Sequence, residues 1–131
     1  MQQFAPTCDA PVDLATLNEM TGGDIEFAAD LVDSYIGSSG ELLRKIRDGF
    51  ARGDRHELAR AAHQLAGASA NVYAAPLCEL CSGLELGSTT ATAAQLDQHI
   101  AGVAAELARV TDILANMVGD RASVSAHVAA P

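Results

Sequence analysis

Apolar residues recur at helical spacing along most of this chain, and the last segment shows the pattern most clearly. Its apolar positions alternate at steps of four and three, the repeat with which one helix packs along another. They are Leu96, Ile100, Val103, Leu107, Val110, Leu114 and Met117. Branched or aromatic residues do not alternate with polar ones, as strands would require. The pattern therefore predicts an all-α protein.

Glycine and aspartate mark the ends of the other predicted helices. Thr21-Gly22-Gly23-Asp24 ends one helix and caps the next, and Arg52-Gly53-Asp54 does the same further on. Within the second helix, Gly37-Ser38-Ser39-Gly40 predicts a kink or a short break. Besides the last helix, the pattern predicts helices over residues 11–20, from 25 to about 52, from about 55 to 72, and from 76 to about 87.

These segments predict an up-and-down antiparallel four-helix bundle with an additional short N-terminal helix. At 131 residues the chain is long enough for one domain, which we place at residues 11–118. Residues 1–10 are expected to form a flexible tail, and residues 119–131 a disordered tail or a linker.

Charge is distributed unevenly. The formal net charge of −9 argues against a nucleic-acid partner, because a phosphate backbone requires a basic face. Yet six of the eight basic residues fall within residues 44–60, against three acidic ones. We call residues 44–60 the basic segment. Ordinary solvated helix faces would explain each charge singly, whereas the segment as a whole is suited to meet an anionic partner.

Targeting signals and cysteine usage indicate the compartment. The N-terminus has no signal-peptide pattern, and the uncharged stretch 61–78 is too polar to insert into a membrane. Three cysteines do not suggest a disulfide framework. A reduced, cytoplasmic setting is therefore predicted.

His63 is the candidate functional residue. If the stripe Leu58, Ala62, Leu65, Ser69 and Val72 faces the core, His63 points about 140° away from it. His56, Arg60 and Gly67 share its outward face.

Two neighbours on that face bear on its chemistry. Glycine inside a helix costs about 1 kcal/mol relative to alanine, and Gly67 is explained if a bulky group must approach the imidazole. An exposed neutral imidazole is a competent nucleophile, and a phosphoryl group on it would require nearby positive charge. Arg60 is the best-placed cation, with Arg55 and His56 as second choices.

The segment His63-Gln64-Leu65-Ala66-Gly67-Ala68-Ser69, followed by Leu77 and Cys81-Ser82-Gly83-Leu84-Glu85, resembles a histidine-containing phosphotransfer (HPt) domain of bacterial multistep phosphorelays. The resemblance covers roughly residues 12–117. It implies that His63 accepts a phosphoryl group from the phospho-aspartate of one receiver domain and passes it to another. It also implies no kinase activity and no cofactor, since the magnesium belongs to the receiver. The partner would be the receiver domain of a response regulator or of a hybrid histidine kinase. The resemblance also implies that the chain is either free in the cytoplasm or the cytoplasmic part of a membrane-bound hybrid sensor kinase.

One departure from the family pattern stands beside the histidine. The family signature His-x-x-Lys-Gly has a lysine where this chain has Ala66, so Arg60 or a partner residue would have to neutralise the phosphoryl group. Glu85 falls where related domains have a polar residue near the imidazole. There its carboxylate could orient the ring and stabilise an imidazolium.

Other readings stay open. Leu17 and Met20, with Arg55 and His56, are candidates for docking a partner, although the two apolar residues could simply cap the bundle. An HPt-like module that binds a receiver or kinase without phosphotransfer is the alternative function, motivated by Ala66. Cys78-Glu79-Leu80-Cys81 spells C-x-x-C but lacks two further zinc ligands at suitable spacing, so we interpret both cysteines as core residues and predict no metal site.

Overall fold

The computed structural model describes the backbone of residues 10–129 and the side chains of residues 10–119. The tail expected over residues 1–10 lies outside this range except for Ala10. The described residues form helices and no strand: α2 (Leu14–Met20), α3 (Ile25–Arg52), α4 (Arg55–Asn71), α5 (Ala75–Gly87) and α6 (Ala93–Ala129). The predicted all-α class is confirmed.

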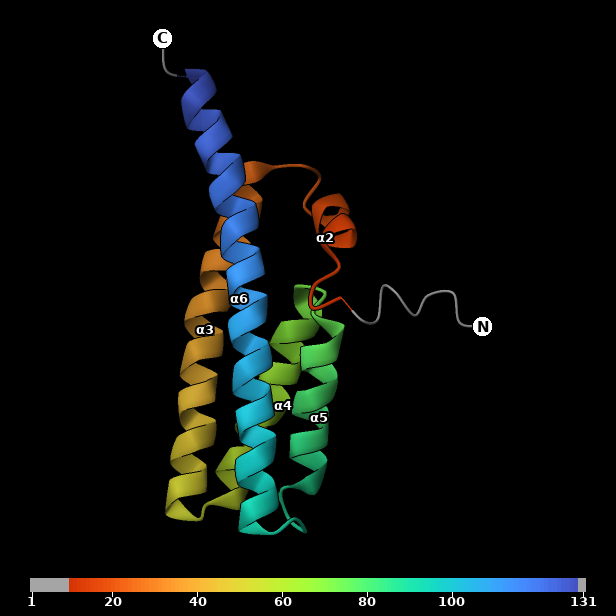
Figure 1. The fold of residues 1–131 in the computed structure, drawn as a ribbon, viewed down its shortest axis with the longest axis vertical. Coiled ribbons are helices and arrows are strands. Elements are labelled where there is room, and N and C mark those ends of the chain that lie inside the picture. The colour runs from red at the N-terminus through yellow and green to blue at the C-terminus, as the bar shows by residue number, and fades with distance from the viewer. Residues whose placement is uncertain (1–9, 130–131) are drawn as a thin grey trace, which may run out of the picture.

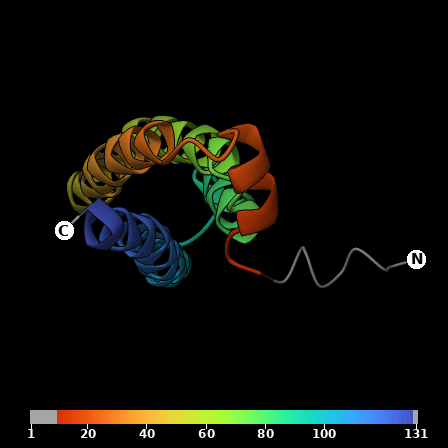
Figure 2. The ribbon, with the colours of Figure 1, turned by 90° about the horizontal axis from the view of Figure 1, so that it is seen from above.

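The four long helices run alternately up and down and form a closed bundle (Figures 1 and 2). α3 packs on α4, α4 on α5, α5 on α6, and α6 returns to α3. The core contains the stripe predicted on α4 and the heptad positions of α6, of which Met117 alone is half-buried. The short α2 lies beside one end of the bundle, and the amide of Asp13 ahead of it donates to the Tyr73 carbonyl at 2.9 Å.

The predicted caps are present. Asp24 accepts from the Phe27 amide at 3.1 Å, and Asp54 accepts from the Glu57 amide at 3.0 Å. Gly53 ends α3 with a φ of +71°, a left-handed conformation that glycine adopts without strain. These features start α4 at Arg55 and so fix which of its residues face outward.

The predicted break at Gly37–Gly40 is wrong, because α3 runs through it. The buried stripe of α3 continues across this segment through Tyr35, Ser39 and Ile46. The Tyr35 hydroxyl bonds the Ser69 hydroxyl of α4 at 2.9 Å. Packing against the neighbouring helices thus outweighs the roughly 1 kcal/mol that each internal glycine costs.

Helix α6 is longer than its apolar repeat, which ends at Met117. It continues to Ala129, into the segment expected to be a disordered tail or a linker. No helix in the described part of the chain combines the length and the apolar character needed to cross a lipid bilayer.

Candidate functional site

His63 lies in the middle of α4 and faces outward, as the helical phase predicts. Its side chain is 73% exposed. The opposite face is wider than expected, since Ala61 and Ala66 are buried together with the predicted stripe. A broad buried face anchors the helix, and the imidazole is therefore presented from a rigid scaffold.

The neighbouring helix α5 supplies a hydrogen-bond partner for the imidazole. Glu85, in the last turn of α5, places Oε1 3.1 Å from His63 Nδ1. Helices α4 and α5 are antiparallel, so the end of α5 lies beside the first half of α4 (Figure 1). If Nδ1 carries the proton, it donates to the carboxylate, and Nε2 keeps its lone pair on the side of the ring away from Glu85.

A shallow depression surrounds this pair. His56, Ala59, Arg60, His63 and Glu85 line it. Arg60 is 62% exposed, and its Nε lies 3.7 Å from a Glu57 carboxylate oxygen. An exposed pair of this kind is weak, so the guanidinium is available to an anion bound at the imidazole.

Gly67, one turn after His63, borders open space. A Cβ built at this position meets no other atom within 4 Å, apart from the adjoining backbone of its own helix. Packing within the domain therefore does not require glycine here. The position is explained if the space is kept for a group from outside the chain.

Ala66 occupies the position of the family lysine and is 8% exposed, packed with the core. A lysine here would have to extend its stem along the helix surface to bring its ammonium to solvent. The side chain at position 66 thus offers His63 no cation, whereas Arg60 lies one turn before His63.

Arg55, predicted as a candidate for docking, has internal partners. Its Nη1 donates to the carbonyls of Ser88, at 2.9 Å, and Ala91, at 2.6 Å. The guanidinium therefore joins the start of α4 to the connection between α5 and α6. Sequence reasoning could not predict this contact, because its acceptors are backbone atoms more than thirty residues away.

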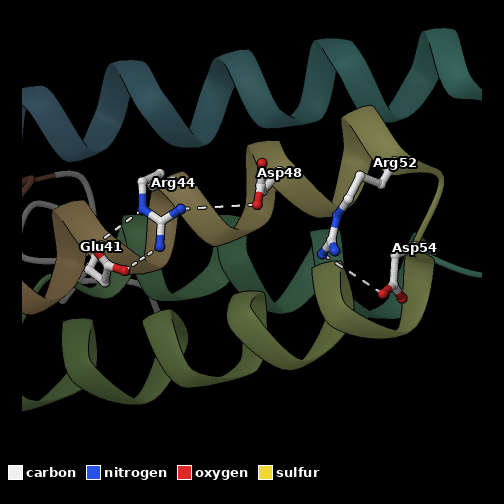
Figure 3. A network of polar contacts seen from close by, with 5 residues as sticks. All are labelled: Glu41, Arg44, Asp48, Arg52 and Asp54. Atoms are coloured by element: carbon white, nitrogen blue, oxygen red, sulfur yellow. Dashed lines mark hydrogen bonds and ion pairs between the residues drawn. The ribbon is translucent and has the colours of Figure 1, made fainter.

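The rest of the basic segment is partly neutralised. Figure 3 shows Arg44 between Glu41 and Asp48, and Arg52 beside Asp54. The Arg44–Asp48 and Arg52–Asp54 pairs each have a nitrogen-to-oxygen distance of 4.0 Å. The hydrogen bond that Arg44 donates to the Glu41 carboxylate lowers the pKa of Glu41. These exposed pairs reduce the local positive charge on which the prediction of an anionic partner rested.

Of the two apolar candidates for docking, Leu17 is buried, which fits the alternative that it caps the bundle. Leu17 is 1% exposed, because it lies on the face of α2 that packs into the core. Met20 is 63% exposed, as expected for a docking candidate. Sequence reasoning missed three other large apolar residues that are exposed, namely Leu14 at 39%, Phe27 at 52% and Leu86 at 80%.

The C-x-x-C pair belongs to the packing of α5. Cys81 is fully buried and Cys78 half-buried, both with free thiols. Burial raises the pKa of the Cys81 thiol to about 12, which keeps it protonated and unreactive. Among the described side chains, no group of three or more His, Cys, Asp or Glu residues is placed to hold a metal ion.

The chain has two further histidines, His99 and His127. His99 is half-buried on α6, and a Cβ on Gly83 would come within 3.2 Å of its ring, so α5 and α6 approach closely there. His127 lies outside the described side chains.

Comparison with known proteins identifies the class. The family model described as "Hpt domain" matches residues 30–118, well over half of the chain, and the chain therefore belongs to the Hpt domain family. The match begins within α3 and contains His63, Gly67 and Glu85. Domains of this family are histidine phosphotransfer modules that interact with receiver domains in phosphorelays. The searches of curated proteins and of solved structures gave no match.

Proposed function

We propose that this chain is a phosphorelay intermediate, in which His63 accepts a phosphoryl group from the phospho-aspartate of one receiver domain and donates it to another. The observation that carries the proposal is the geometry of His63, an imidazole 73% exposed whose Nδ1 lies 3.1 Å from the Glu85 carboxylate. Such a ring has one nitrogen engaged by the protein and the other available to a partner.

The chemical step follows from that geometry. The Nε2 lone pair attacks phosphorus, the bond between phosphorus and the aspartyl oxygen breaks, and its electron pair leaves with the receiver's carboxylate. The ring retains the Nδ1 proton and becomes cationic, and Glu85 stabilises that charge through its hydrogen bond. In onward transfer a second receiver's aspartate attacks phosphorus, and the electron pair of the P–N bond returns to Nε2.

Arg60 is the residue proposed to support the phosphoryl group. It lines the same depression as His63 and is held by a weak pair with Glu57. Rotation of its side chain toward the imidazole would place a guanidinium beside the phosphoryl oxygens. Arg60 would thus supply, from the preceding turn, the charge that Ala66 does not.

The direct experiment incubates the purified chain with a radiolabelled phosphorylated receiver. We expect label on the wild type, none on His63→Gln, and a shorter phosphohistidine lifetime for Arg60→Gln and for Glu85→Ala. If His63→Gln is labelled like the wild type, the assignment of His63 fails. Unchanged transfer and lifetime in Glu85→Ala would remove only the role of Glu85.

A second candidate function rests on Ala66, which leaves the position of the family lysine without charge. In that case the chain binds a receiver or kinase without accepting phosphate. Co-purification with a receiver that transfers no label to the wild type would favour this interaction module. The partner in both cases is a receiver of a response regulator or of a hybrid histidine kinase, and we place the encounter in the cytoplasm.

A further inference from the structure

Arg55 occupies a position in α4 at which a basic residue does not stabilise its own helix. It is the first residue of α4, immediately after the Asp54 cap. The amino end of a helix carries partial positive charge, so a basic residue there is unfavourable for α4. The same guanidinium is favourable at the carboxyl end of α5, where it donates to the carbonyls of Ser88 and Ala91.

The contact of Arg55 leads to Glu85 through a short chain of hydrogen bonds. Ser88 is 1% exposed, and its carbonyl accepts from Arg55. Its hydroxyl and its amide both donate to the carbonyl of Glu85, at 2.7 Å and 3.3 Å. Arg55 therefore holds the residue that closes the turn on which Glu85 stands.

The last turn of α5 is thus fixed to α4 at two places. Glu85 meets His63, and eight residues earlier on α4 Arg55 meets Ser88. Eight residues of helix span about 12 Å, so the two contacts enclose roughly two turns of α4. A helix end without such partners frays, and fraying of this turn would move the carboxylate away from the imidazole.

We propose that Arg55 is a positioning residue for the phosphoacceptor: by holding Ser88 it keeps the Glu85 carboxylate on His63 Nδ1 and so fixes the ring for transfer. The expected effect of Arg55 on phosphotransfer rests on the proposed function, whereas its expected effect on the orientation and protonation of the His63 ring does not. Arg55 thus acts within the domain through Glu85, whereas Arg60 lines the open depression beside His63.

The imidazole itself provides the first test. The fraction of His63 with its proton on Nδ1 is measured by long-range ¹H–¹⁵N spectroscopy of the free chain. We expect that fraction to fall in Arg55→Gln, to recover partly in Arg55→Lys, whose ammonium can still donate to a carbonyl, and to stay at the wild-type value in the control Arg109→Gln. Arg109 is an exposed α6 residue paired with Glu106 at 3.4 Å. An unchanged fraction in a folded Arg55→Gln overturns the proposal.

A double-mutant cycle that combines Arg55→Gln with Glu85→Ala provides the second test. Arg55→Gln alone should slow phosphotransfer to His63 roughly fivefold, because small displacements of a reacting group are costly. In the Glu85→Ala background the same change should have no further effect, since the carboxylate that it positions is gone. A fivefold loss in both backgrounds would show general destabilisation and would overturn the proposal. If the wild type accepts no label, the proposed function fails, and the ¹⁵N measurement still decides the role of Arg55.

Discussion

Gly67 is a position at which one substitution should raise the stability of the fold and slow phosphotransfer at the site. Within α4, replacing glycine by alanine removes backbone freedom from the unfolded chain and is worth about 1 kcal/mol. The added methyl meets no other atom of the domain within 4 Å, beyond the adjoining turns of α4. Gly67→Ala should therefore stabilise the protein by about 1 kcal/mol, which for a domain of this size raises the midpoint of thermal unfolding by about 4 °C.

The same methyl should impair phosphotransfer. It projects on the outward face one turn from His63, where a receiver must approach the imidazole. Crowding of a closely packed contact costs about 1–3 kcal/mol, and 1.4 kcal/mol corresponds to tenfold in rate. We therefore expect transfer from a phosphorylated receiver to slow by about fivefold or more, in a variant that is more stable than the wild type.

Gly102→Ala is the matched control. Gly102 lies in α6, and a Cβ there also meets nothing within 4 Å. This variant should gain the same stability and transfer at the wild-type rate. Stability is measured by urea unfolding and transfer by the rate of label appearance. If Gly67→Ala transfers as fast as Gly102→Ala, Gly67 does not keep space for a partner, and that reasoning is refuted.

Three further predictions concern the core and the missing cation. Gly49→Ala should destabilise the domain by about 1–3 kcal/mol, because a Cβ there would lie 3.1 Å from the Leu58 amide nitrogen; urea unfolding measures the loss. Ala66→Lys should lengthen the phosphohistidine lifetime, because it restores the cation of the family signature; the decay of label measures it. Burial raises the pKa of Tyr35 to about 12, so its contribution to stability is complete below pH 10 and is lost as the pH rises from 10 to 12. In that window the free energy of unfolding of Tyr35→Phe should therefore fall less steeply with pH than that of the wild type, by up to about 1.4 kcal/mol per pH unit.

Each of these has a result that contradicts it. A Gly49→Ala variant as stable as the wild type would mean that α3 and α4 can separate at no cost. If the lifetime in Ala66→Lys is unchanged, the lysine position does not reach the phosphoryl group in this domain. An identical alkaline stability profile for Tyr35→Phe would show that the phenol ionises in the folded state as readily as in the unfolded chain.

The parts of the fold that depend on neighbouring residues were predictable from sequence. The caps at Asp24 and Asp54 act over three residues, and the stripe of α4 fixes the outward direction of His63 by helix geometry alone. The α6 pattern likewise depends on a repeat that one helix contains. Local rules sufficed for these features because each is determined within a few turns.

Features that depend on tertiary contacts were not predictable in the same way. The helix through Gly37–Gly40 is held by packing on both sides of it, and Leu17 is buried by the bundle beneath α2. Glu85 was placed near His63 from the family resemblance, since no periodicity relates residues on different helices. The contact from Arg55 to two carbonyls had no signal at all, because backbone acceptors leave no trace in the side-chain pattern.

The most direct measurement locates the phosphoryl group after the full chain has been incubated with a phosphorylated receiver. Peptide mapping under alkaline conditions, which preserve phosphohistidine, should find one acid-labile phosphoryl group, on the peptide that contains His63. Addition of a second, unphosphorylated receiver should then remove it. Phosphate on His56 or His99 instead, or a wild-type chain that binds the receiver and carries no phosphate, would contradict the assignment of His63 as the phosphoacceptor.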